Sequence, residues 1–138
     1  MMYVTYTFGF EAAHRLFEYD GKCSNIHGHN YKVEVAVKGK QGNDGIIVDF
    51  NELKYIAGKV RNVLDHSLII FEGDNILEGR PKNFRHIKII FVSWNPTAEN
   101  FARYIYEYFK DELQKGKVYY VRVWETENSS AVYVGDRK

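Results

Sequence analysis

Residues 10–35 read FEAAHRLFEYDGKCSNIHGHNYKVEV and contain three of the five histidines and the only cysteine of the chain. At both ends of this stretch, apolar and polar residues alternate. Such alternation is typical of β-strands with one buried face. It predicts a first strand over 3–14 and a second over about 29–38.

The parity of these two strands brings the histidines together. The first strand places His14 on its apolar face, and extending the second strand backwards puts His27 and His29 on its apolar face. Gly28 between them allows close approach of another backbone or a ligand. Three imidazoles on one side would suit Zn²⁺ and leave its fourth position open. Two alternatives remain on the residues alone: hydrogen-bonded core histidines, and a closed zinc site with Cys23 as the fourth ligand.

Composition excludes several classes of protein. With 138 residues, of which 45% are hydrophobic, the chain can bury one core, so we expect a single domain over 1–138. A formal charge of +1 predicts neither nucleic-acid binding nor membrane-surface binding. No apolar run reaches the about 18 to 20 residues of a membrane helix. One cysteine and no signal-peptide pattern favour a cytoplasmic protein.

Two helices are expected. Residues 50–64 carry apolar side chains at helical spacing. A second helix is predicted from Asn95, as the N-cap, with Pro96 in its first position, to Gly116 at its end.

The remaining elements suggest a mostly antiparallel sheet. Residues 117–126 and 131–135 read as two strands of a hairpin, joined across ENSS. Between the helices lies a mixed region with two short apolar runs, SLIIF and IKIIFV. Hairpins at both ends of the chain predict an α+β fold, with an antiparallel sheet and helices packed on one face.

Other polar residues are candidates for a site. His66, after the first helix, could neutralise the helix dipole, or Asp65 could polarise it for proton transfer. Glu125 shares the parity of the apolar residues in its strand, so it could point inward and bind two N–H groups of a ligand, or be exposed at the strand end. His86 has no identifiable companion and reads as structural or surface.

Six stretches, in order and spread over nearly the whole chain, resemble the 6-pyruvoyl-tetrahydropterin synthase and 6-carboxy-tetrahydropterin synthase family. Any one of them is a weak signal, but the ordered set is specific. They are FEAAHRL (10–16), CSNIHGHNYKVEV (23–35), GIIVDFNELK (45–54), LDHS (64–67), NPTAEN (95–100) and WET (124–126).

This resemblance implies the tunnelling fold, with a four-stranded antiparallel sheet and two long helices, assembled as trimers that stack into hexamers. It implies Zn²⁺ as cofactor and a small-molecule pterin as substrate. The implied roles, in full, are zinc binding by His14, His27 and His29, a catalytic base at Cys23, a proton relay at Asp65 and His66 contributed by a neighbouring subunit, pterin anchoring by Glu125, and a pterin pocket lined by Thr97 and Glu99.

The resemblance also implies a reaction. Three residues separate Cys23 from His27, as in the 6-carboxy type of the family, which serves 7-deazaguanine (queuosine or archaeosine) synthesis. Enzymes of this type convert 7,8-dihydroneopterin triphosphate to 6-carboxy-tetrahydropterin, acetaldehyde and triphosphate. The 6-pyruvoyl type usually has a longer insert there. A folate-directed type usually has Glu in place of this Cys; Glu18 is nearby, but Cys23 holds the family position. A zinc-stapled binding protein is the non-enzyme alternative. Residues 70–85 match no family pattern, and the triphosphate-binding residues stay unassigned.

Overall fold

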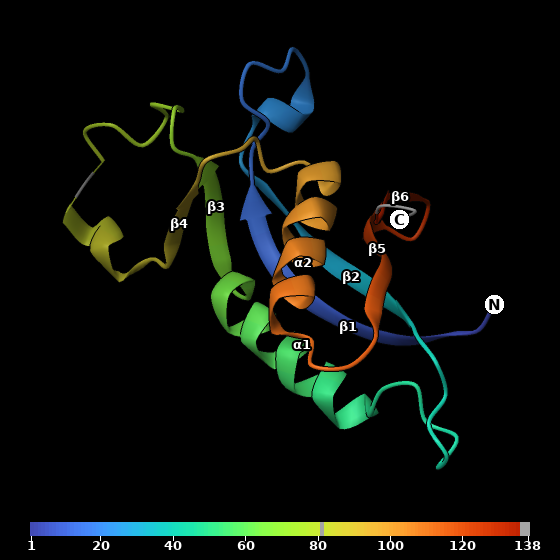
Figure 1. Ribbon diagram of the computed structural model, residues 1–138. Coiled ribbons are helices and arrows are strands. Elements are labelled where there is room, and N and C mark those ends of the chain that lie inside the picture. Colours follow the sequence, from blue (N-terminus) through green and yellow to red (C-terminus); the bar gives the residue numbers. More distant parts are fainter. Residues whose placement is uncertain (81, 136–138) are drawn as a thin grey trace.

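The computed structural model describes residues 1–80 and 82–135, which form one six-stranded sheet and two α-helices (Figure 1). In chain order the elements are β1 (Tyr3–His14), β2 (His27–Lys38), α1 (Phe50–Leu64), β3 (Ser67–Phe71), β4 (Ile89–Val92), α2 (Ala98–Glu112), β5 (Lys117–Thr126) and β6 (Ser129–Val134). Two short 3₁₀ turns, Lys22–Ser24 and Lys82–His86, lie in the connections.

The sheet is mixed, with strand order β4-β3-β1-β2-β5-β6. The pairs β1–β2, β2–β5 and β5–β6 are antiparallel, but β3 is parallel to β1 and β4 is parallel to β3. The prediction of a four-stranded, antiparallel sheet was therefore wrong in strand number and in direction. The antiparallel part, β1-β2-β5-β6, has the predicted four strands.

The two extra strands come from the apolar runs between the helices. Strands of parallel sheets often read as continuous apolar segments without alternation, and neither run carried a strand periodicity; β3 is largely buried, whereas β4 is not. Helix α1 provides the crossover that places β3 beside the end of β1, where Ser67 pairs with Ala12 and Ile69 with His14.

Both helices pack on the same face of the sheet and enclose the core. Side chains of β1, β2 and β5 meet those of α1 and α2 in one hydrophobic cluster. Helix α2 begins later than predicted: Thr97, not Asn95, is the N-cap, and its hydroxyl accepts from the Asn100 N–H at 3.2 Å. Helix α2 also ends at Glu112, before Gly116, whose φ of 83° turns the chain into β5.

The long strand β1 has one partly open edge. Its residues from Tyr3 to His14 pair with β2, but β3 covers only Ala12 to His14 on the other side. In the described part of the chain, no strand pairs with the rest of that edge. Strand β6 pairs only with β5. Unpaired strand edges can accept a strand from another chain.

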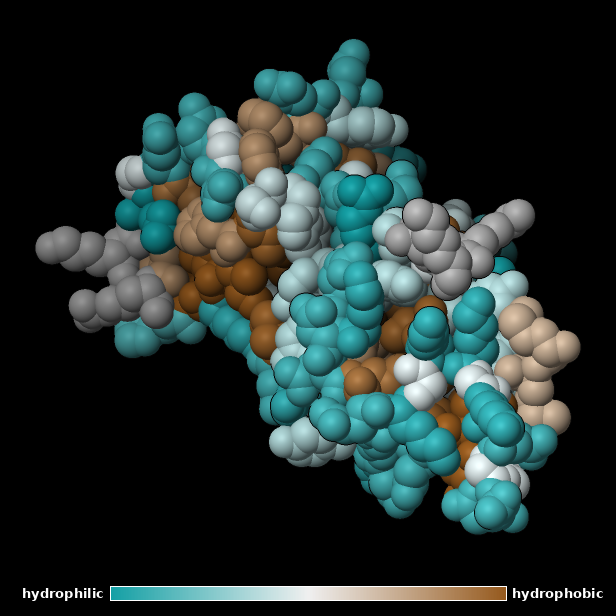
Figure 2. All heavy atoms as spheres, viewed as in Figure 1, coloured by the Kyte–Doolittle hydropathy of each residue, from teal (hydrophilic) through white to brown (hydrophobic). Residues whose placement is uncertain are grey.

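The surface is largely hydrophilic in the view of Figure 2, with hydrophobic residues gathered beside β3 and β4. Exposed apolar side chains of this region include Ile76, Ile87 and Phe91. Within residues 1–80 and 82–135, no helix is long and apolar enough to cross a membrane.

Substitution of Phe101 tests the described packing of the core. Its ring is fully buried and contacts Phe10, Tyr31 and Trp94. We expect Phe101→Ala to lower the free energy of unfolding by about 3–5 kcal/mol, because it removes buried contacts and leaves a cavity. Phe50→Ala, at a position that is 56% exposed, should change it by no more than about 0.5 kcal/mol. Urea denaturation checks both; equal losses would contradict this description of the core.

Candidate metal and catalytic site

Three histidines form a cluster at the end of the β1–β2 pair. His14 pairs with His27, and His29 pairs with Ala12, so the antiparallel register puts all three imidazoles on the helix-covered face. One nitrogen from each ring lies within 4.8 Å of the others. At Gly28 an added Cβ would lie 3.2 Å from the Ala12 carbonyl oxygen, which explains glycine between the two histidines. The residues predicted to converge do converge.

Backbone carbonyls orient two of the rings. The Nδ1 of His14 donates to the Pro96 carbonyl at 2.6 Å, and the Nδ1 of His27 donates to the Asn25 carbonyl at 2.7 Å. A carbonyl only accepts, so each Nδ1 carries the hydrogen and each neutral ring has its lone pair on Nε2. These two Nε2 atoms face each other at 3.2 Å. Two facing lone pairs repel each other, and a cation bound between them relieves this repulsion.

Burial favours the neutral rings that a metal requires. It lowers the pKa of His14 to about 4, although the hydrogen bond to Pro96 opposes this shift. Burial also lowers the pKa of His29, with Glu125 acting in the opposite direction. The Nε2 of His29 is buried and has no hydrogen-bond partner among the described residues. The donor set of three nitrogens therefore fits a divalent metal ion such as Zn²⁺.

Glu125 lies at the edge of the histidine cluster. Its Oε2 is 3.8 Å from the Nε2 of His29, and its side chain is 27% exposed. A register shift in β5 between Trp124 and Thr126 occurs at this residue. The carboxylate is thus close to the candidate metal position yet accessible to a ligand.

Cys23 is half-buried in the 3₁₀ turn Lys22–Ser24, between β1 and β2. The Cys23 carbonyl accepts from the Leu16 N–H at 2.9 Å, which closes this loop. In the described chain, the group of candidate ligand atoms consists of the three histidines, without the Cys23 thiol. The geometry therefore favours an open three-histidine site over the closed site.

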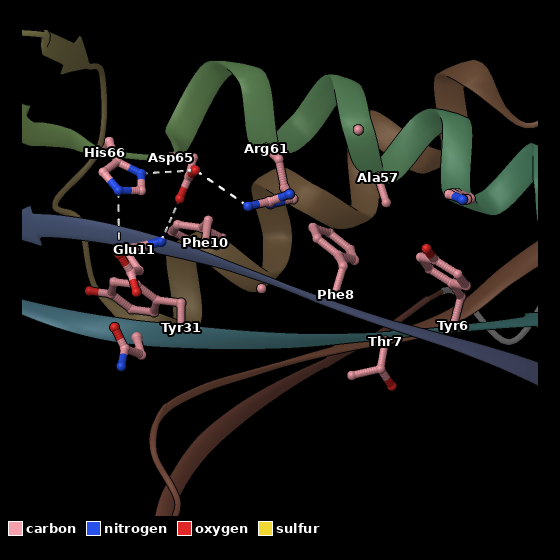
Figure 3. Close-up of a pocket in the computed structure, with 14 residues that line it drawn as sticks. Tyr6, Thr7, Phe8, Phe10, Glu11, Tyr31, Ala57, Arg61, Asp65 and His66 are labelled. Atoms are coloured by element: carbon pink, nitrogen blue, oxygen red, sulfur yellow. Dashed lines mark hydrogen bonds and ion pairs between the residues drawn. The ribbon is translucent and has the colours of Figure 1, made fainter.

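Asp65 and His66 form a second cluster, at the partly open edge of β1 (Figure 3). The Asp65 carboxylate contacts the Nδ1 of His66 at 2.9 Å and accepts from the Glu11 N–H at 2.8 Å. Burial acts to raise the pKa of Asp65, but the Glu11 N–H, His66 and Arg61 together hold that pKa below its usual range. The ionised Asp65 can orient the His66 ring.

His66 is exposed and held in an unusual backbone conformation. Its φ is 54°, and its N–H donates to the Glu11 carbonyl at 2.6 Å. Its side chain is 74% exposed, with Nε2 at 3.4 Å from a Glu11 carboxylate oxygen. Strained non-glycine residues of this kind are often found at functional sites.

His29 of the first cluster and His66 of the second both line a cavity of about 380 Å³. Among the described residues, no hydrogen bond, ion pair or ring contact joins the side chain of Asp65 or His66 to the three histidines or Cys23. A cavity of about 730 Å³ lies between the open edge of β1 and α1, lined by residues that include Tyr6, Phe8 and His66 (Figure 3).

Two residues predicted to bind the substrate, Thr97 and Glu99, lie at the start of α2. The Thr97 hydroxyl caps α2, and Glu99 is exposed in the first turn of that helix. Glu11, which contacts both Asp65 and His66, was not predicted to take part in the site. The Pro96 carbonyl was not predicted as a partner for His14 either, since that contact joins residues 82 positions apart.

Curated relatives match most of the chain. A protein of Rickettsia bellii named 6-carboxy-5,6,7,8-tetrahydropterin synthase is 36% identical over 124 residues, covering 86% of this chain and 90% of the relative. A Haemophilus influenzae protein of the same name is 33% identical, covering 96% of this chain and 99% of the relative.

Solved structures share the fold. A crystal structure of an uncharacterized Wolinella succinogenes protein matches with a TM-score of 0.87 at 21% identity, covering 98% of both chains. The 6-pyruvoyl tetrahydropterin synthase of Caenorhabditis elegans matches with a TM-score of 0.75 at 26% identity, covering 98% of this chain and 96% of the other. The family model described as 6-pyruvoyl tetrahydropterin synthase matches residues 3–136, and the chain therefore belongs to the 6-pyruvoyl tetrahydropterin synthase family.

Proposed function

We propose that the protein is a zinc-dependent 6-carboxy-5,6,7,8-tetrahydropterin synthase, a lyase that acts on 7,8-dihydroneopterin triphosphate. The products would be 6-carboxy-tetrahydropterin, acetaldehyde and triphosphate, in 7-deazaguanine synthesis. The observation that carries the proposal is the cluster of His14, His27 and His29, with two ring nitrogens facing each other at 3.2 Å. The names of the curated relatives support the choice of reaction.

His14, His27 and His29 would hold the zinc ion, with the tautomers of His14 and His27 set by the Pro96 and Asn25 carbonyls. When bound, zinc supplies Lewis-acid stabilisation of the charge that develops on the substrate side-chain oxygens. Tyr31 packs against this site. Its hydroxyl lies 3.2 Å from the Nδ1 of His14, and its buried ring stacks on Phe10.

The remaining residues move protons and bind the pterin. Cys23, as a thiolate, would remove a carbon-bound proton beside the pterin ring. His66, oriented by Asp65, would relay protons to and from it. The Glu125 carboxylate would accept two N–H groups of the pterin ring, an interaction that is strong because one partner is charged. Thr97 and Glu99 would line the pterin pocket, Thr97 through its backbone because its hydroxyl caps α2.

A second reaction is the 6-pyruvoyl type, which eliminates triphosphate from the same substrate without releasing acetaldehyde. The name of the family model and the solved Caenorhabditis elegans relative favour it. The two reactions share the proposed site, so the product distinguishes them.

We also propose a homohexamer, a dimer of trimers in the cytoplasm, in which Asp65 and His66 serve the metal site of a neighbouring subunit. The open edges of β1 and β6 offer antiparallel pairing between subunits. The lack of a hydrogen bond, ion pair or ring contact between the two clusters, among the described residues, supports a shared site.

Product analysis tests the reaction. Zinc-loaded protein incubated anaerobically with 7,8-dihydroneopterin triphosphate should yield 6-carboxy-tetrahydropterin and acetaldehyde, detected by mass spectrometry and an aldehyde assay. A 6-pyruvoyl product without acetaldehyde would identify the second reaction instead. If the substrate is unchanged, both reactions are excluded, and the alternative of a zinc-stapled binding protein is favoured.

Removing one histidine tests the metal site. We expect His27→Ala to weaken zinc binding by at least about 100-fold, since loss of a direct ligand should exceed the loss caused by removing a ligand's supporting partner. His86→Ala, at an exposed position outside the cluster, is the matched control and should bind zinc normally. Equilibrium dialysis with metal analysis measures both. Normal zinc binding by His27→Ala would contradict the assignment.

Mixed oligomers test the shared site. Cys23→Ala and His66→Ala should each retain zinc and assembly but lose turnover. Mixed at equal amounts and reassembled, they should recover about a quarter of wild-type activity, because a quarter of neighbouring pairs then combine both intact residues. If each site is built within one subunit, no activity returns. Loss of zinc from Cys23→Ala would instead indicate the closed site.

A further inference from the structure

The loop that carries Cys23, residues 15–26, is anchored to the connection between β3 and β4 by a buried ion pair. The Nε of Arg15 lies 2.8 Å from the Oδ2 of Asp74, and the Asp74 side chain is only 2% exposed. The other Asp74 oxygen accepts from the Ile76 N–H at 3.0 Å. A buried carboxylate is costly unless it is paired, and removing one partner of such a pair leaves the other buried without a counter-charge, so this contact links the two segments.

A second anchor lies beside the first. The side chain of Asn95 accepts from the Phe17 N–H at 2.9 Å and donates to the Phe17 carbonyl at 3.4 Å. The ring of Phe17 also packs on Phe71, with centroids 5.1 Å apart. Both polar groups of the Phe17 backbone are thus bound by one residue of the segment that leads to α2.

The loop has little packing of its own that could replace these anchors. Its 3₁₀ turn contains no buried residue, and Tyr19 and Ile26 are about half exposed, at 51% and 49%. Glu18 adopts a φ of 56°, which is unfavourable for a non-glycine residue. The hydrogen bond from the Leu16 N–H to the Cys23 carbonyl links the anchored residues directly to the cysteine.

We propose that Asp74 and Asn95 are positioning residues, which hold the loop so that the Cys23 thiol stays fixed relative to the three histidines. This rests on the proposed role of Cys23 as the base. Asp74 acts through Arg15, and Asn95 acts through the backbone of Phe17. The histidines lie on β1 and β2 and are held by the pairing of these strands and by the Pro96 carbonyl. The loop contributes the Asn25 carbonyl that orients His27, but Asn25 lies beside β2 and away from the anchored residues Arg15 and Phe17, so we expect loosening of the anchors to leave the metal ligands in place.

The experiment compares Asp74→Asn with Glu112→Gln, a matched control that weakens the ion pair between Lys59 and Glu112, also 2.8 Å long, at the α1–α2 contact. Because Cys23 is the only cysteine, its alkylation by iodoacetamide reports on the loop alone. In Asp74→Asn we expect faster alkylation, an unchanged zinc content, and a kcat lowered roughly 10- to 100-fold with little change in KM, as expected for a misplaced catalytic group.

Asn95 provides a second, independent variant. Asn95→Ala should show the same pattern, and Asn95→Asp should recover part of kcat because it keeps the acceptor for the Phe17 N–H. The proposal would be overturned if Asp74→Asn and Asn95→Ala both had the same alkylation rate and the same kcat as Glu112→Gln. If the wild-type protein shows no turnover, the proposed function fails, whereas the alkylation rates still decide whether these residues hold the loop.

Discussion

The antiparallel register between β1 and β2 determines the geometry of the candidate metal site. It pairs His14 with His27 and Ala12 with His29, so three imidazoles from two strands share one face. Side chains alternate along a strand, so a slip of one residue would turn His27 and His29 to the opposite face. Buried apolar pairs further along the same strands, such as Phe10 with Tyr31, oppose that slip.

The core continues directly into the site. Tyr31 is 2% exposed, stacks on Phe10, and reaches His14 with its hydroxyl. His14 is itself buried. Its hydrogen bonds and its neutral state, which the lowered pKa favours, reduce the free-energy cost of burying the ring. Rigid packing therefore extends to the ring of His14, while the Pro96 and Asn25 carbonyls in the adjoining loops orient the rings of His14 and His27.

The other residues proposed for the site lie on a loop and at a strand edge. Cys23 lies on a loop fixed from outside, and Asp65 and His66 lie at the partly open edge of β1. The histidines proposed to bind the metal thus lie on paired strands, whereas the residues proposed to transfer protons lie on a loop and after α1. This arrangement makes the proposed chemistry dependent on contacts that are distant in sequence, namely those with Asp74, Asn95 and, in the proposed hexamer, a second subunit.

Features with a local period or a local motif could be predicted from the chain alone. Alternation predicted β1 and β2 and the shared face of the histidines, and helical spacing predicted α1. The other features depend on contacts between segments that are distant along the chain. The strands β3 and β4 are continuous apolar runs whose direction depends on a crossover, and Asn95 does not cap α2 because its side chain binds Phe17. The partners of His14, His66 and Arg15 are likewise set by long-range packing, which no spacing along the chain encodes.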